Sequence, residues 1–335
     1  MIFHPGILAL VSGSVFVTFM MLYAAAVGSL IALRWDFQSS SAYQLSLERK
    51  TYLISTIMNY VLGFQIISAL LFIFTVDDIH KLFVGAMCAT GSLNANPVGW
   101  NALVSKILVC FLAGLWLVMN YLDQKVEDYP LVRIKCTLLG VLLPFIVLDS
   151  FLQLQYFLGL NPDIITSCCG SLFSASGGGV ASSLSGLPVR SAMIFFYAGC
   201  GFLFFVSFLC LSSKKAFFRY FHSLVAAALL FVALAGIVSF VSIYIYELPT
   251  HHCPFDILQK GYGFVGYPLY ITLFFGVFYG LLPGVFQPLK SVVSLRETIN
   301  RIERSWIFLS MGCMSFFVAI ATYRVVSSNL TYISY

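Results

Sequence analysis

Hydrophobic residues occur along the chain in eight long runs, and most charged residues lie in the short stretches between them. Each run has about 18 or more residues, the length that an α-helix needs to cross the hydrocarbon core of a bilayer. The runs lie at approximately 7–33, 52–76, 102–121, 134–154, 190–211, 221–246, 267–286 and 306–325. The pattern predicts an all-α polytopic membrane protein with about eight transmembrane helices.

The composition supports this class. Of the 335 residues, 60% are hydrophobic and 9% are charged, whereas roughly a quarter of the residues in an average soluble domain are charged. The first run lacks a basic flank on its N-terminal side, so we interpret it as a span and not as a cleaved signal. The lipid bilayer is therefore the first partner that the sequence predicts.

The distribution of Lys and Arg predicts the orientation of the spans, because basic residues favour cytoplasmic loops. Four alternate loops, at about 34–51, 122–133, 212–220 and 287–305, and the helix ends beside them hold 13 of the 18 basic residues. We expect a cytoplasmic-type (plasma or inner) membrane, with these loops in the cytoplasm and both chain termini outside. The net charge of +5 then reflects topology and does not indicate nucleic acid.

The two halves of the chain resemble each other weakly. Val98-Gly99-Trp100 begins the third run and Val265-Gly266-Tyr267 begins the seventh, each after a loop with one cysteine. A parallel repeat of four helices would explain this spacing, and chance would also explain so short a motif. The expected organisation is a first half at 1–154, an extracytoplasmic linker loop at 155–189 rich in Ser and Gly, and a second half at 190–335.

The cysteines fall into two groups. Cys110, Cys200, Cys210 and Cys313 lie within apolar runs, and Cys136 lies near a helix end. The other four, which lie in predicted extracytoplasmic loops together with most of the histidines, are Cys88, Cys168, Cys169 and Cys253. That compartment is oxidising, and an even number of cysteines there indicates disulfide bonds.

Geometry limits how these four cysteines can pair. Adjacent residues have Cα atoms about 3.8 Å apart, which is shorter than the usual disulfide range of about 4.4–6.8 Å. A bond between Cys168 and Cys169 would therefore be strained. The unstrained arrangement sends one of them to Cys88 and the other to Cys253.

The segment His251-His252-Cys253-Pro254-Phe255-Asp256 is the richest in reactive side chains. Three interpretations stay open. His252 could activate the Cys253 thiol for disulfide exchange with Cys88, Cys168 and Cys169. His251, Cys253, Cys168 and Cys169 could instead hold a soft or borderline metal ion, or His251 and His252 a haem near the outer face. Alternatively, the cysteines form structural disulfides beside two solvated histidines.

These residues lead to two functional hypotheses. In the first, the outward face performs thiol–disulfide redox chemistry, electron transfer or metal handling with an extracytoplasmic thiol protein or an electron-transfer partner. In the second, the chain is a permease or a membrane-anchoring subunit of a larger complex, with purely structural disulfides. Asp149 is the only carboxylate expected well inside a span, and this scarcity of buried charge disfavours ion coupling.

Overall fold

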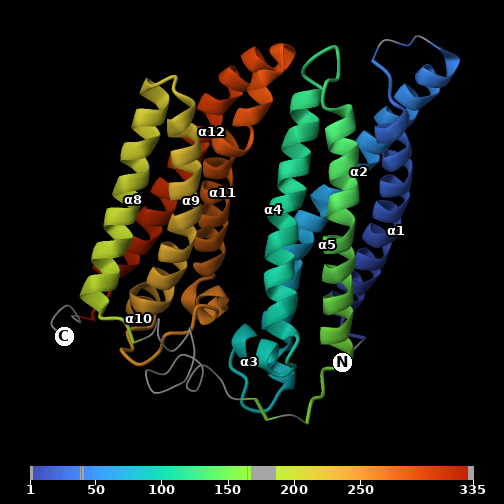
Figure 1. The fold of residues 1–335 in the computed structure, drawn as a ribbon. Coiled ribbons are helices and arrows are strands. Elements are labelled where there is room, and N and C mark those ends of the chain that lie inside the picture. The colour runs from blue at the N-terminus through green and yellow to red at the C-terminus, as the bar shows by residue number, and fades with distance from the viewer. Residues whose placement is uncertain (1–2, 38, 40, 164, 167–185, 331–335) are drawn as a thin grey trace. The chain divides into compact units, whose positions relative to one another are not determined.

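The computed structural model describes residues 1–335 except 1–2, 38, 40, 164, 167–185 and 331–335. Within the described residues the fold is all-α, and eight helical segments are long and apolar enough to cross a membrane. This confirms the predicted fold class (Figure 1). The eight long helices are α1 (Pro5–Arg34), α2 (Ala42–Asp78), α4 (Gly99–Asp123), α5 (Val132–Leu158), α8 (Val189–Ser212), α9 (Ala216–Gly236), α11 (Gly266–Val285) and α12 (Val293–Ser327).

Shorter helical elements lengthen or connect these spans. Helix α9 continues through a π-helical segment, η2 (Ile237–Val241), into α10 (Ser242–Tyr246), and the three together form one span. Glu247 ends it in the left-handed conformation, with φ of 56°. The remaining short elements are η1 (Ile79–Leu82), α3 (Ala89–Asn94), η3 (Asp256–Leu258), η4 (Lys260–Tyr262) and η5 (Gln287–Ser291).

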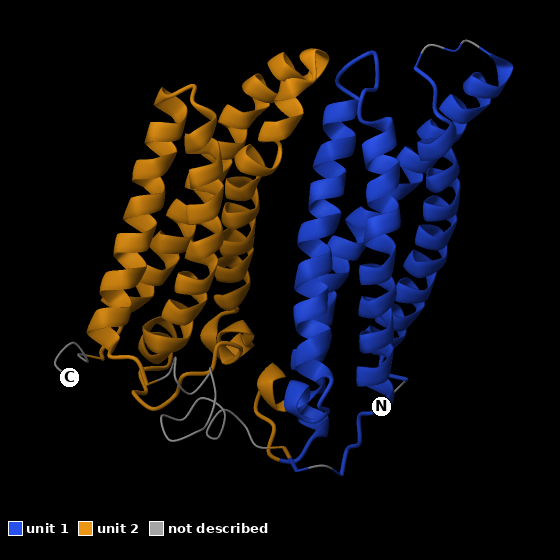
Figure 2. Cartoon of the chain, viewed as in Figure 1, with its two compact units in different colours: residues 1–84, 92–165 blue, residues 85–91, 166–335 orange. Residues whose placement is uncertain are grey.

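The chain forms two compact units, shown in different colours in Figure 2. Unit 1 consists of residues 1–84 and 92–165, and unit 2 consists of residues 85–91 and 166–335. The short segment 85–91 therefore belongs to unit 2, although its neighbours in the sequence on both sides belong to unit 1. This exchange places Cys88 in the same unit as Cys253.

The helices of each unit pack in the same cyclic order. In unit 1, α1 and α4 each contact both α2 and α5; in unit 2, α8 and α11 each contact both α9 and α12. Gly99 and Gly266 begin the third long helix of their units, where an added Cβ would lie 2.2 Å from the Leu93 carbonyl oxygen or 2.8 Å from Leu258 Cδ2. Both observations support a duplication, which stays a prediction together with the domain boundaries expected from the sequence.

A charged pair lies inside the helical core of unit 1. Lys106 on α4 donates to Asp149 Oδ2 on α5 at 2.7 Å, and Gln65 on α2 donates to the same oxygen at 2.8 Å. The two charged side chains are 2% and 0% exposed. Lys106 is seven residues into its helix, about 10 Å along the axis. The sequence suggested that Lys106 could extend to the membrane surface, but the structure turns it inward because the Asp149 carboxylate is within reach.

Three further polar clusters hold helix ends together. In unit 1, Lys135 contacts Asp123 at 2.7 Å. In unit 2, Glu303 on α12 accepts from Arg219 at 3.1 Å and from Lys290 at 2.5 Å. The buried His222 on α9 hydrogen-bonds Ser207 on α8 at 2.9 Å and the Gly280 carbonyl on α11 at 3.1 Å. Such groups are paired because an isolated charge in an apolar core is costly.

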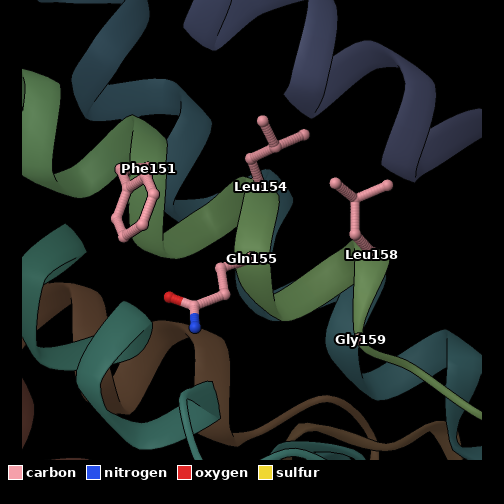
Figure 3. A pocket seen from close by; sticks show the side chains of 5 residues that line it. All are labelled: Phe151, Leu154, Gln155, Leu158 and Gly159. Carbon is pink, nitrogen blue, oxygen red and sulfur yellow. The ribbon is translucent and has the colours of Figure 1, made fainter.

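The surface of unit 1 has a groove of about 400 Å³ along the last turns of α5. Figure 3 shows its lining, which is Phe151, Leu154, Gln155, Leu158 and Gly159. Phe151, Leu154 and Leu158 are 59%, 39% and 58% exposed, as expected for side chains that face lipid. None of the cysteines and histidines singled out in the sequence lines this groove.

Replacing Lys106 with Met should destabilise the protein strongly, because it leaves the Asp149 carboxylate buried without its counter-charge. We expect a loss of about 3–5 kcal/mol in the free energy of unfolding, measured by denaturant titration of the purified protein in detergent. The double variant Lys106→Met with Asp149→Leu should recover most of this loss.

The matched control is Glu297→Gln, which breaks the exposed Arg301–Glu297 pair, whose side chains are 80% and 86% exposed. It should change stability little. A Lys106→Met variant as stable as this control would contradict the prediction.

Candidate thiol site

The structure brings together two of the four loop cysteines. Cys88 and Cys253 are thiols whose Sγ atoms lie 3.4 Å apart, although 165 positions separate them in the sequence. Both side chains are 0% exposed. Cys168 and Cys169 lie outside the described residues, so their expected pairing with Cys88 and Cys253 stays a prediction.

The segment 85–91 adopts a tight conformation that carries Cys88 into unit 2. Gly85 has φ of +84°, in the region that favours glycine, and an added Cβ would lie 2.7 Å from the Thr166 carbonyl oxygen. Gln259 donates its side-chain amide to the Met87 carbonyl at 2.6 Å. Cys88 directly precedes α3, and its carbonyl accepts from Gly91 N–H at 3.0 Å.

Two tyrosines fix the backbone around Cys253. Tyr246, the last residue of α10, donates its hydroxyl to the Cys253 carbonyl at 2.5 Å. Tyr270 on α11 donates to the Pro254 carbonyl at 2.7 Å. The Phe255 N–H donates to Cys253 Sγ at 3.4 Å, and Thr90 Oγ1 lies 3.5 Å from the same sulfur.

Asp256, the first residue of η3, adds a carboxylate to the pair of thiols. One of its carboxylate oxygens and the two sulfurs all lie within 4.8 Å of one another. Its Oδ2 is hydrogen-bonded to His251 Nε2 at 2.5 Å. Its Oδ1 is buried and has no hydrogen-bond partner among the described residues.

The two histidines differ in their surroundings. The His251 ring packs edge-on against Tyr246, with centroids 4.6 Å apart, and its side chain is 26% exposed. His252 donates from Nδ1 to the Val238 carbonyl in η2 at 2.9 Å. His251 thus contacts the carboxylate that faces the sulfurs, whereas the bond of His252 is to the backbone. The catalytic role that the sequence assigned to His252 stays a prediction.

Negative charge at this site affects a nearby tyrosine. The pKa of Tyr262 is raised from its ordinary value, first by burial and then by the negative charges of Asp256 and Cys253. Tyr262 also packs edge-on against Tyr246, with ring centroids 4.7 Å apart. It therefore stays a neutral phenol beside the carboxylate at neutral pH.

The arrangement allows two kinds of chemistry. Two sulfurs at 3.4 Å need to approach by little more than 1 Å to reach the disulfide length of about 2.05 Å. Two thiolates and one carboxylate are also three protein ligands of the kind that Zn²⁺ binds. Either chemistry uses Cys88, Cys253 and Asp256, which meet only after folding.

Sequence reasoning missed the direct contact of Cys88 with Cys253 and the position of Asp256 beside them. Asp256 belongs to the His-His-Cys segment, so its place in the sequence was the available signal. Nothing in the local sequence of Cys88 shows that residues 85–91 belong to unit 2, because that follows from tertiary packing.

No protein-family model matches the chain, and neither a curated protein nor a solved structure matches it significantly. The fold and the candidate site together define a multi-pass helical membrane protein. One of its two compact units holds a buried pair of cysteines next to an aspartate–histidine pair.

Replacing Gly85 with Ala should separate the two sulfurs. A Cβ at this position strains the backbone by about 1–3 kcal/mol and meets the Thr166 carbonyl. We expect formation of the Cys88–Cys253 disulfide by a mild oxidant to slow at least severalfold, as measured by alkylation and mass spectrometry. Gly261→Ala is the matched control, because a Cβ at Gly261 meets no atom within 4 Å. Equal rates for both variants would show that the geometry of Gly85 does not position Cys88.

Proposed function

We propose that the protein performs thiol–disulfide exchange at the extracytoplasmic face of a cytoplasmic-type membrane, with Cys88 and Cys253 as the redox pair. The observation that carries this proposal is the 3.4 Å approach of the two sulfurs inside unit 2. The fold supplies the membrane anchor. The distribution of basic residues in the loops supports the outward position of the site.

The exchange conserves atoms and electrons. The Cys253 thiolate attacks one sulfur of a disulfide in an extracytoplasmic partner protein, and the other sulfur of that disulfide leaves as a thiolate and takes up a proton. Cys88, after losing its proton, then attacks the Cys253 sulfur of the mixed disulfide and releases the second partner thiol. The partner gains two electrons and two protons, and the protein gains the Cys88–Cys253 disulfide.

Burial determines how the partner reaches the pair. Both sulfurs are 0% exposed, so the segment 85–91 must move for a mixed disulfide to form. This segment is short, and one side-chain hydrogen bond from Gln259 holds it at Met87. Cys168 and Cys169, which lie outside the described residues, are candidates for a second pair that contacts the partner and exchanges with Cys88 and Cys253.

Alanine variants of the two cysteines test the proposal. In intact membranes treated with a small dithiol reductant and then with an oxidant, wild-type Cys88 and Cys253 should cycle between free and bonded forms. Cys88→Ala should abolish reduction of a model protein disulfide by the purified, prereduced protein, and it should leave Cys253 able to form a trapped mixed disulfide. Cys313→Ala, a change in α12, is the control and should cycle as the wild type does.

Two results would contradict the redox proposal. The first is a Cys88–Cys253 disulfide that resists reduction in the folded protein, since a structural bond behaves in this way. The second is an unchanged exchange activity in Cys88→Ala. Either result would favour the alternative in which the chain is a permease or a membrane-anchoring subunit with a structural cross-link.

A metal centre is the second candidate function, favoured by the carboxylate oxygen of Asp256 within 4.8 Å of both sulfurs. This ligand set suits Zn²⁺ or another borderline ion. If the site holds such a metal, protein purified without chelator should contain about one ion per chain by elemental analysis. Cys253→Ala and Asp256→Ala should each lose it, and Cys313→Ala should retain it. Metal-free wild-type protein with reversible thiol chemistry would exclude this candidate.

A further inference from the structure

Closing a disulfide in a buried site creates a problem of proton transfer. Two thiols lose two protons when they become a disulfide, and reduction needs two protons to return. Cys88 and Cys253 are both 0% exposed, so water cannot collect these protons at the sulfurs directly. A protein group that contacts both the thiols and the surface would solve the problem.

Asp256 has the position of a proton acceptor for the two thiols. One of its carboxylate oxygens lies within 4.8 Å of both sulfurs, a separation that one water molecule can bridge. Its side chain is 8% exposed, and its Oδ1 has no hydrogen-bond partner among the described residues. A buried carboxylate oxygen with no partner is costly, and a proton or a bridging water would satisfy it.

His251 connects this carboxylate to the surface. Its Nε2 is hydrogen-bonded to Asp256 Oδ2, on the other side of the carboxylate from the unpartnered oxygen, at 2.5 Å. Its side chain is 26% exposed, and the edge-on contact with Tyr246 fixes the ring. Imidazole is the side chain whose ordinary pKa, about 6.5, allows it to accept and release protons near neutral pH.

We infer that Asp256 and His251 form a proton relay between the Cys88–Cys253 pair and the aqueous phase. Asp256 accepts a thiol proton as the disulfide forms, and the neutral imidazole of His251 takes it from the carboxyl group and releases a proton to water. Reduction runs the same path in reverse. This inference rests on the proposed exchange function and deepens it.

The other titratable groups at the site do not provide this path. Tyr246 and Tyr270 donate their hydroxyls to the Cys253 and Pro254 carbonyls. Tyr262 has a raised pKa, so it is no base at neutral pH. His252 donates from Nδ1 to the Val238 carbonyl. Among the described groups, the aspartate–histidine pair alone joins the surroundings of the sulfurs to a partly exposed side chain.

The test is the pH dependence of the rate at which Cys88 and Cys253 are oxidised. Purified full-length protein in detergent is prereduced and mixed with oxidised glutathione; the reaction is stopped with acid, and the disulfide is quantified by mass spectrometry. Near pH 7 we expect Asp256→Asn to lower the rate at least tenfold, since positioned acid–base groups contribute about 10²–10⁴-fold. Above about pH 9 the thiols ionise without help, and the deficit should shrink.

His251→Gln is the second variant, and it keeps the carboxylate in place. It should lower the rate near pH 7 by less than Asp256→Asn and weaken the rise of the rate between pH 5.5 and 7.5, the window about one unit on either side of the ordinary histidine pKa. Glu247→Gln is the matched control, because Glu247 is exposed and contacts Asn329. It should follow the wild-type profile.

The outcomes separate the relay from the exchange function. If wild-type Cys88 and Cys253 do not cycle, the proposed function is wrong. If they cycle and Asp256→Asn matches the wild type at every pH, the relay is wrong and the exchange function stands. A deficit in Asp256→Asn that is equal at all pH values would also overturn the relay, because a residue that only positions the thiols would produce it.

Discussion

Every buried polar group in a membrane-spanning helix bundle must find its partner within the protein, because the hydrocarbon core offers none. This constraint determines where the charges of this chain lie. Lys106, Asp149 and Gln65 meet from three helices of unit 1, and Glu303 joins Arg219 to Lys290 in unit 2. A partner for each charge exists only in one register of the packed helices. The polar pairs therefore select the arrangement of the helices, whereas apolar contacts alone would tolerate sliding.

The same requirement explains which features the sequence could predict. The eight spans followed from the length and spacing of apolar runs, since spanning a bilayer is a property of each segment by itself. The inward turn of Lys106 did not follow, because it depends on a carboxylate 43 positions away. His222 lies at a helix end in the sequence, and its bonds to Ser207 and Gly280 depend on how three helices pack.

The candidate site shows the same division between local and tertiary information. Residue types alone selected Cys88 and Cys253 as cysteines in loops, and the richness of the 251–256 segment directed attention to Cys253. Their direct approach depends on residues 85–91 joining unit 2, which no local pattern encodes. The emphasis on His252 came from adjacency in the sequence. Packing instead directs His251 to Asp256 and His252 to a backbone carbonyl.

A carboxylate beside two thiols suits proton transfer better than it suits a stable thiolate. Its negative charge repels a thiolate at short range, and the repulsion is strong because burial lowers the local dielectric constant. The same charge makes the carboxylate a good acceptor for the proton that a thiol must lose. An uncharged disulfide relieves the repulsion, so the arrangement favours the bonded form once an oxidising partner is present. Burial of the sulfurs, the orphan oxygen of Asp256 and the partly exposed His251 then become parts of one device, in which electrons leave through sulfur and protons leave through the aspartate–histidine pair.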